Sequence, residues 1–233
     1  MTHSLVCLPG WAMAPSVFDP LISALPSPTP RAQALPRGGT LQEWATQMAS
    51  ALPADTVLCG WSLGGMLALQ LARTVPLKAL ILINTTPCFV QTDDWPHASS
   101  AQDFTHFKQA FHQDPSALLR HFIQLQNQGE PNPRAFGRQL AAHLIEDTTS
   151  LGKGLEILAH TDLRNTVSEL PTLPTLILHG SEDRVIPSQA GHWLAAALPH
   201  ATLFTLPNAG HALPVSQPQA LAQIIHTFLS RLP

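Results

Sequence analysis

A serine between two glycines, at the junction of two apolar runs, constrains the fold of this chain more than any other feature. Gly60-Trp61-Ser62-Leu63-Gly64 has the form G-x-S-x-G. The run before it, TVLCG, predicts a buried strand, and the run after it, LGGMLALQLARTV, predicts an apolar helix. In this context the motif is typical of a sharp turn that holds a nucleophilic serine hydroxyl above a sheet. The alternative interpretation is a serine N-cap flanked by turn glycines.

Further apolar runs of strand length predict a parallel sheet around this turn: SLVCLPG, LKALILIN, TLPTLILHG and ATLFTLP. Continuous apolar runs are typical of strands whose two faces are both covered by helices. Residues 93–160 are instead polar and rich in Gln, His and Phe, and they predict helices without buried strands. The sequence therefore predicts a doubly wound α/β fold, with a mostly parallel central sheet flanked by helices. We expect a core of residues 1–92 and 161–233, and a helical lid insert, 93–160, over one edge of the sheet.

Composition argues against several classes of protein. The 233 residues carry a formal net charge of -3 and only 12% are charged, so no nucleic-acid partner is expected. No apolar run reaches the roughly eighteen residues of a membrane span, and the start, MTHSLVCLPGW, lacks the pattern of a signal peptide. Cys7, Cys59 and Cys88 lie in or beside apolar runs, which predicts buried free thiols and a cytoplasmic protein. No cluster of ligand residues stands out, so neither a metal nor a cofactor is expected.

A serine hydroxyl needs a base to become a nucleophile, and the base needs an acid to orient it. For this turn the expected chain order is Ser, then Asp or Glu, then His. LILHGSEDRVIP supplies Asp183 just past a predicted strand, and LPNAGHALP supplies His211 in a later loop. We predict a triad of Ser62, Asp183 and His211, with Glu182 and Asp162 as alternative acids. Other histidines are interpreted as structural or surface residues: His179, His192, His200 and His226.

A negatively charged tetrahedral intermediate needs N–H donors that are already in place. The backbone N–H of Leu63, directly after the serine, is one candidate, and the loop after the first strand should supply the other. In that loop Pro9 has no N–H and Gly10 permits a tight turn, so we predict Trp11 as the second donor. The alternative is that Pro-Gly-Trp is only a turn with an aromatic anchor.

At this point the chain resembles the α/β-hydrolase superfamily over nearly its whole length, and within it the carboxylesterases of biotin synthesis. The segments that carry the resemblance are GWSLGG, TTPCFVQTDDWP, FIQLQ, GLEILAHTDLR, HGSEDRVIP and AGHALP. PCF followed by DDWP, and GLEIL followed by TDLR, are the distinctive ones, because they span the insert and its borders. The resemblance implies an α/β-hydrolase fold and hydrolysis of the methyl ester of pimeloyl-acyl-carrier protein, without a cofactor or metal.

The resemblance also implies roles for particular residues. Ser62, Asp183 and His211 take the triad roles, and Trp11 and Leu63 those of the oxyanion hole. The substrate contacts implied by the family are Trp11, His211 and, in the insert, Phe122, Leu125 and Gln126. The family holds an acidic carrier protein with arginines on the insert, a role that falls on Arg134 and Arg138, whose i,i+4 spacing puts both on one face of a helix. A monomer that binds the carrier protein is expected.

The chain departs from the family in several places. Pro9 stands where most relatives have histidine, the first two edge strands look missing or reduced, and ALPRGG is a shortened loop. An earlier arginine position of the insert falls on His121 or Ala117, beside Arg120. A general short-chain esterase, or another hydrolase of this fold, is therefore kept as the alternative function. A non-catalytic binding module is a third hypothesis, but such a protein would usually have lost a triad residue.

Overall fold

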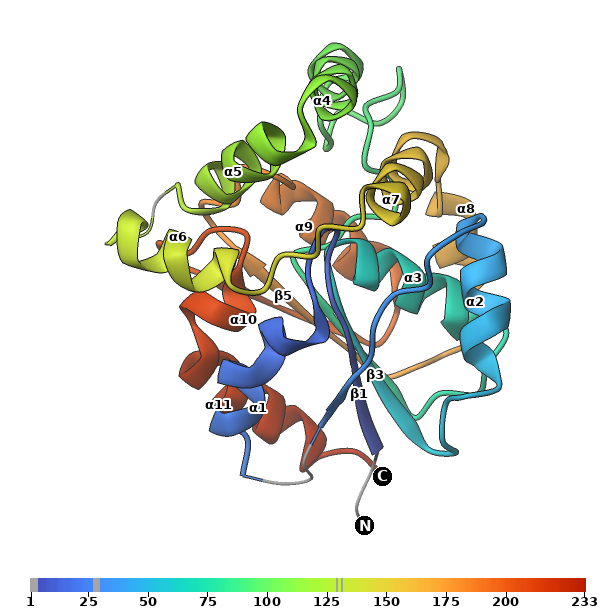
Figure 1. Ribbon diagram of the computed structural model, residues 1–233. Helices are drawn as coiled ribbons and strands as arrows, with labels where there is room; N and C mark the ends of the chain where they lie inside the picture. Colours follow the sequence, from blue (N-terminus) through green and yellow to red (C-terminus); the bar gives the residue numbers. More distant parts are fainter. Residues whose placement is uncertain (1–3, 27–29, 129, 131) are drawn as a thin grey trace.

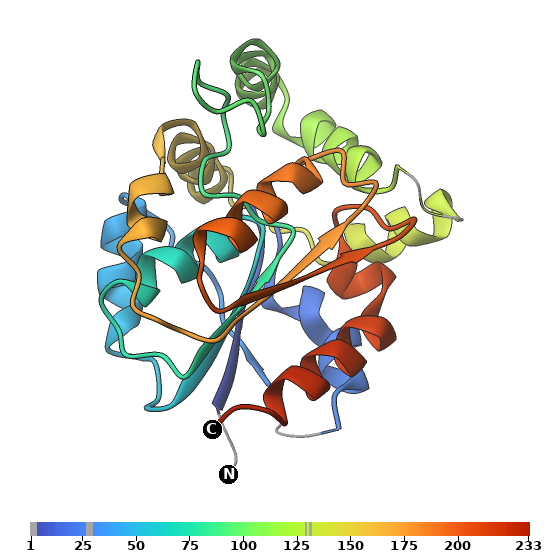
Figure 2. The same cartoon turned by 180° about the vertical axis from the view of Figure 1, so that it is seen from behind.

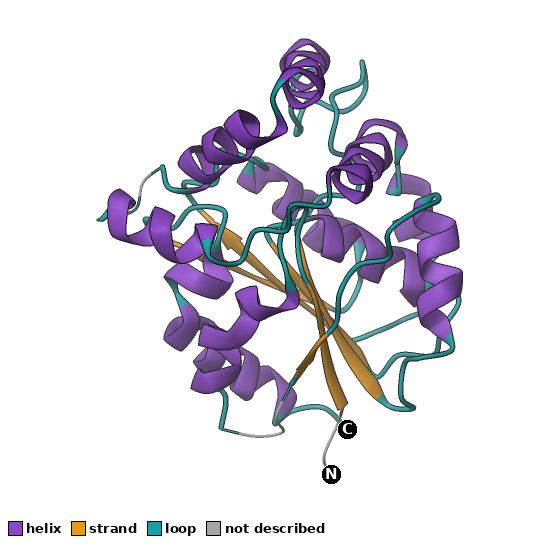
Figure 3. Ribbon diagram, viewed as in Figure 1, coloured by secondary structure: helices purple, strands orange, loops and turns teal. Residues whose placement is uncertain are grey.

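Six parallel strands form one sheet at the centre of the molecule. The computed structural model describes residues 4–26, 30–128, 130 and 132–233. The strand order is β2-β1-β3-β4-β5-β6, and every pairing between described neighbours is parallel. The strands are β1 (Ser4–Leu8), β2 (Arg31–Ala32), β3 (Thr56–Trp61), β4 (Ala79–Ile83), β5 (Thr175–Gly180) and β6 (Ala201–Leu206). The predicted α/β architecture is confirmed (Figures 1 and 3).

Helices cover both faces of this sheet (Figures 1 and 2). One layer contains α2 (Leu41–Ala49), α3 (Leu63–Ala72), α8 (Arg164–Ser168) and α9 (Ser188–Ala197). The other contains η1 (Pro15–Phe18), α1 (Asp19–Ala24), α10 (Leu213–Ser216) and α11 (Pro218–Leu229). All ten residues of α3 and all five of β4 are buried, which is why these two segments are apolar throughout. No described helix is long and apolar enough to cross a membrane.

Of the five described helices between β4 and β5 in the chain, the first four lie above the carboxyl ends of the strands (Figure 1). They are α4 (Ala101–Gln113), α5 (Pro115–Gln126), α6 (Pro133–Ala141) and α7 (Thr148–His160). Each begins after a residue whose side chain accepts a hydrogen bond from the first turn: Ser100, Asp114, Asn132 and Asp147. We call residues 93–160 the insert; the exact division between core and insert stays a prediction.

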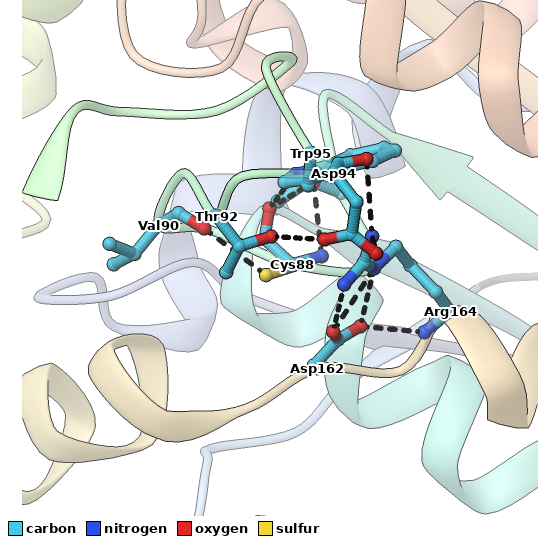
Figure 4. Close-up of polar contacts among 8 residues, drawn as sticks. Cys88, Val90, Thr92, Asp94, Trp95, Asp162 and Arg164 are labelled. Atoms are coloured by element: carbon cyan, nitrogen blue, oxygen red, sulfur yellow. Dashed lines mark hydrogen bonds and ion pairs between the residues drawn. The ribbon is translucent and has the colours of Figure 1, made fainter.

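The two ends of the insert are fastened to each other by one polar cluster (Figure 4). The Arg164 guanidinium contacts the Asp162 carboxylate at 2.6 Å and the Asp94 carboxylate at 3.0 Å, and it lies over the ring of Trp95. Trp95 Nε1 in turn donates to the carbonyl of Cys88 at 2.9 Å. The backbone of Cys88 forms an isolated antiparallel β-bridge with that of Asp162. We call Asp94, Trp95, Asp162 and Arg164 the insert clamp. It gives the DDWP and TDLR segments a common structural role.

The cysteines are buried and free, as predicted. Cys7 and Cys59 are register partners on β1 and β3, and Cys88 follows β4. Burial raises the pKa of the Cys88 thiol, which keeps it protonated and inert. The thiols therefore behave as small apolar side chains in the core.

Candidate active site

Ser62 occupies a strained turn between β3 and α3. Its φ of 56° and ψ of -121° lie outside the conformations that non-glycine residues usually adopt. A Cβ on Gly60 would meet the backbone of Gly64, and one on Gly64 would meet the carbonyl of Leu8. Only glycine fits at either position, because Gly60 packs directly onto the start of α3 and Gly64 packs directly onto the end of β1. Thr85 Oγ1 donates to the Ser62 carbonyl at 2.7 Å and fixes the turn from below.

Asp183 and His211 form a buried hydrogen-bonded pair. Both side chains are at most 1% exposed, and His211 Nδ1 donates to Asp183 Oδ2 at 2.8 Å. The other carboxylate oxygen, Oδ1, accepts the backbone N–H groups of Val185 at 2.8 Å and Ile186 at 2.9 Å. Burial by itself would raise the pKa of Asp183, but the interactions with His211 and His179 outweigh it and hold that pKa well below its usual range. The acid is therefore ionised and rigidly oriented.

The alternative acids lie elsewhere. The Glu182 carboxylate is solvent-facing and contacts Arg184 at 3.4 Å, while Asp162 belongs to the insert clamp. Neither contacts His211 in the part of the chain that the structure describes. Of the acids weighed from the sequence, the structure brings only Asp183 to the histidine.

Asn84 supports the loop that carries His211, and the sequence analysis did not single it out. Its Nδ2 donates to the carbonyls of Gly210 and His211, both at 2.8 Å, and its Oδ1 accepts the N–H of Gly180 at 3.0 Å. Trp61 Nε1 donates to the same His211 carbonyl at 2.9 Å. The signal available in the sequence was an amide at the end of the apolar run ALILIN. These bonds fix the histidine beside the turn that carries Ser62.

His211 Nε2, the nitrogen that faces away from Asp183, is buried and has no hydrogen-bond partner among the described residues. Ser62 is 6% exposed and lines a cavity under the insert. Within the described hydrogen bonds, none joins Ser62 Oγ to His211 Nε2. Such bonds often tighten only when substrate is bound, so the open nitrogen fits an unliganded site.

The two predicted oxyanion donors lie next to Ser62. Leu63 is the first residue of α3, where N–H groups are unpaired and the helix dipole favours negative charge. The loop with Trp11 also passes close by, since a Cβ on Gly10 would lie 3.1 Å from the Cβ of Ser62. Neither the Trp11 nor the Leu63 amide donates to another backbone or side chain that the structure describes. Two open N–H groups beside one hydroxyl are what an oxyanion hole needs.

An aromatic cluster forms the roof of the cavity. The indole of Trp11 meets Phe122 and Phe107 edge to face, with ring centres 5.1 Å and 5.6 Å apart, and its Nε1 donates to the Leu151 carbonyl. Phe111 packs on the same indole. Phe107 and Phe111 of α4 thus pack on a residue of the core.

The cavity itself is largely apolar. Ser62 shares it with two insert residues that the family resemblance had pointed to, Phe122 and Leu125. The structure adds further apolar residues that the sequence analysis did not assign to it: Phe89, Phe104, Phe107, Leu155, Leu158 and Val185. Gln126 is fully buried, and neither atom of its side-chain amide has a partner among the described residues. Its backbone carbonyl lies over Gly210, beside His211.

An open groove between α5 and α6 carries three arginines: Arg120, Arg134 and Arg138. All three are exposed, and none forms an ion pair within the described residues. Glu130 also lines the groove, and burial raises the pKa of its carboxyl. We call this surface the arginine groove.

The sequence and the fold match a known family. The sequence model of the alpha/beta hydrolase family matches residues 5–224. The chain therefore belongs to the alpha/beta hydrolase family. The solved structure of an esterase from Exiguobacterium antarcticum is similar to it in fold, with a TM-score of 0.84 at 18% identity over 98% of this chain and 92% of that one.

Curated relatives narrow the comparison. A protein from Aromatoleum aromaticum is 39% identical over 95% of this chain and 96% of the relative. A protein from Xylella fastidiosa (strain M12) is 36% identical over 99% of this chain and 96% of the relative. Both carry the name pimeloyl-[acyl-carrier protein] methyl ester esterase. These relatives confirm the narrower resemblance that the sequence motifs indicated.

Proposed function

We propose that this chain is a serine carboxylesterase that hydrolyses the methyl ester of pimeloyl-acyl-carrier protein in the cytoplasm. The observation that carries the proposal is the buried pair of Asp183 and His211 beside a cavity lined by Ser62, in a chain whose relatives bear that substrate in their names. The buried free thiols support a reducing compartment.

In the first half of the reaction the Ser62 hydroxyl attacks the ester carbonyl. His211 Nε2 takes the proton, and the Nδ1–H bond to Asp183 holds the ring in the required tautomer and stabilises the imidazolium that forms. The carbonyl oxygen becomes negatively charged and accepts the N–H groups of Trp11 and Leu63. The C–O bond then breaks, His211 returns its proton to the leaving oxygen, and methanol departs.

In the second half water hydrolyses the acyl-enzyme. His211 Nε2 takes a proton from the water as its oxygen attacks the acyl carbon, and the same two N–H groups hold the second oxyanion. Collapse breaks the bond to Ser62, whose oxygen recovers the proton from His211. The product is a free carboxylate at the end of an acyl chain that stays attached to its carrier.

The remaining site residues take binding roles in this proposal. Phe122 and Leu125 contact the methylene chain, because they line the cavity above Ser62. Gln126 does not line this cavity, but its buried amide has no partner among the described residues and is a candidate for a hydrogen bond to the substrate. Arg134 and Arg138 in the arginine groove hold the acidic carrier protein, since unpaired exposed arginines attract negative charge.

The test is hydrolysis of pimeloyl-acyl-carrier protein methyl ester, followed by mass spectrometry of the carrier. Wild type should remove the methyl group, whereas Ser62→Ala should leave the ester intact. An acetyl ester of a small alcohol serves as the comparison substrate. Rapid turnover of the acetyl ester with none of the carrier-linked ester would favour the general short-chain esterase. Turnover by the Ser62→Ala variant would reject the serine mechanism.

A further inference from the structure

A second histidine lies against the proposed catalytic acid. His179 is near the end of β5, its side chain is 1% exposed, and its Nε2 lies 3.0 Å from the carbonyl of Ile186 and 3.5 Å from Asp183 Oδ2. A carbonyl only accepts hydrogen bonds, so this geometry assigns the proton to Nε2. That N–H therefore points between the Ile186 carbonyl and the carboxylate.

The opposite edge of the His179 ring is closed by α9. A Cβ on Gly191 would lie 2.7 Å from His179 Nδ1, so the helix backbone packs directly against this nitrogen. Nδ1 is buried and has no partner among the described residues. A proton on Nδ1 would thus be buried without an acceptor, which agrees with the Nε2–H tautomer. Asp183 is the one charged group that pairs with His179 in the described part of the chain.

Two imidazoles therefore share one carboxylate oxygen. His211 Nδ1 lies 2.8 Å from Asp183 Oδ2, and His179 Nε2 faces the same atom from the side of β5. A donor on this oxygen draws negative charge away from its partner. By also binding the Ile186 carbonyl, His179 fastens the far end of the loop that begins at Asp183.

We propose that His179 is a positioning residue for Asp183: its Nε2–H orients the carboxylate and limits the charge that the carboxylate offers to His211. This inference rests on the proposed function, in which Asp183 is the triad acid. It gives a role in the reaction to a histidine that the sequence analysis interpreted as structural.

The test compares two replacements of nearly equal size. His179→Gln keeps an N–H donor near the position of Nε2, whereas His179→Met has a similar length and no donor. For each variant we would measure the melting temperature, kcat and KM, and the pH profile of kcat/KM. His179→Gln should retain the wild-type profile. His179→Met should lose about tenfold in kcat with little change in KM, because the N–H that faces the Asp183 carboxylate is lost.

The pH profile separates positioning from simple structural support. Without the His179 donor the Asp183 carboxylate binds protonated His211 more strongly, so the acid limb of the His179→Met profile should move to higher pH. Equal kcat values and equal acid limbs in the Gln and Met variants would overturn the inference, whatever their melting temperatures. If neither variant folds, the tautomer decides: imidazole nitrogen NMR of the wild-type protein should find the His179 proton on Nε2, and a proton on Nδ1 would overturn the inference.

Failure of the proposed function has a different signature. It appears as absence of ester turnover by the wild-type protein, or as full turnover by Ser62→Ala. Either result would also reject the present inference. Failure of the inference alone leaves wild-type turnover and its dependence on Ser62 intact, with no difference between the Gln and Met variants.

Discussion

The side-chain amide of Asn84 donates to the backbone carbonyl of His211 at 2.8 Å and so ties the end of β4 to the loop after β6. Asn84→Ala should cost about 2–3 kcal/mol of unfolding free energy, because the Gly210 carbonyl and the Gly180 N–H lose a partner and the His211 carbonyl keeps only its bond from Trp61. Urea unfolding measures this loss. Asn208→Ala is the matched control, since Asn208 also has a positive φ but is exposed. Equal losses in the two variants would show that backbone conformation alone is responsible.

The triad assignment predicts a graded loss of activity. Ser62→Ala and His211→Ala should each reduce kcat by about 10⁴-fold or more, and Asp183→Asn somewhat less, because it disturbs the tautomer while the other groups remain. Steady-state ester hydrolysis checks this order. Glu182→Gln is the control and should keep wild-type activity. A silent Asp183→Asn change beside a damaging Glu182→Gln change would mean that the acid is misassigned.

The low pKa of Asp183 predicts a pH dependence of stability. A carboxyl whose pKa is lower in the folded than in the unfolded state stabilises the fold above its unfolded pKa of about 3.9, and this contribution is lost as pH falls toward the folded pKa. Wild type should therefore lose unfolding free energy more steeply than Asp183→Asn below about pH 4. Urea titrations at several pH values measure both slopes. Parallel curves would contradict the lowered pKa.

The cavity predicts a preference for acyl length. Phe122→Ala should weaken turnover of long acyl esters by about 1–3 kcal/mol in kcat/KM, and that of acetyl esters much less, because only a long chain reaches the missing ring. A series of p-nitrophenyl esters provides the measurement. Phe136→Ala removes a buried ring of α6 that does not line the cavity, so it should leave the length preference unchanged. A uniform loss across the series in Phe122→Ala would indicate general damage instead.

The arginine groove predicts a salt-dependent step specific to the carrier-linked substrate. Arg134→Glu combined with Arg138→Glu should slow hydrolysis of that substrate, mainly through association, since exposed charges steer encounters and are screened over about 10 Å at 0.1 M salt. The rate on a small uncharged ester should barely change. The matched control is Arg73→Glu on the core, remote from the groove. Salt-independent turnover of the carrier-linked ester by both wild type and the double variant would remove the docking role.

The main strands could be predicted from the sequence, because a strand that is buried on both faces is a continuous apolar run such as LKALILIN. Strand β2 has no such run, because it consists of only Arg31 and Ala32 at the edge of the sheet. Its pairing with β1 depends on residues far away in the sequence. The same reason applies within the candidate site. Order along the chain indicated Asp183 and His211, whereas the contacts of Asn84 with His211 and of His179 with Ile186 exist only after the strands have aligned. A buried polar residue at the end of an apolar strand is the one local sign that both share.

The insert clamp affects the entropy that the chain loses when the connection between β4 and β5 closes during folding. The entropy lost when a loop is closed depends on the length between its fixed points and rises only slowly with that length. Because Arg164 joins Asp162 to Asp94, the chain is fixed at both borders of the insert, and the bond from Trp11 Nε1 to the Leu151 carbonyl fixes it again at α7. The stretch between Asp94 and Leu151 carries α4, α5 and α6, and a change in its length adds little to the entropy of closure. We therefore expect substrate range to change most readily in this stretch, where Phe122 and Leu125 line the cavity above Ser62.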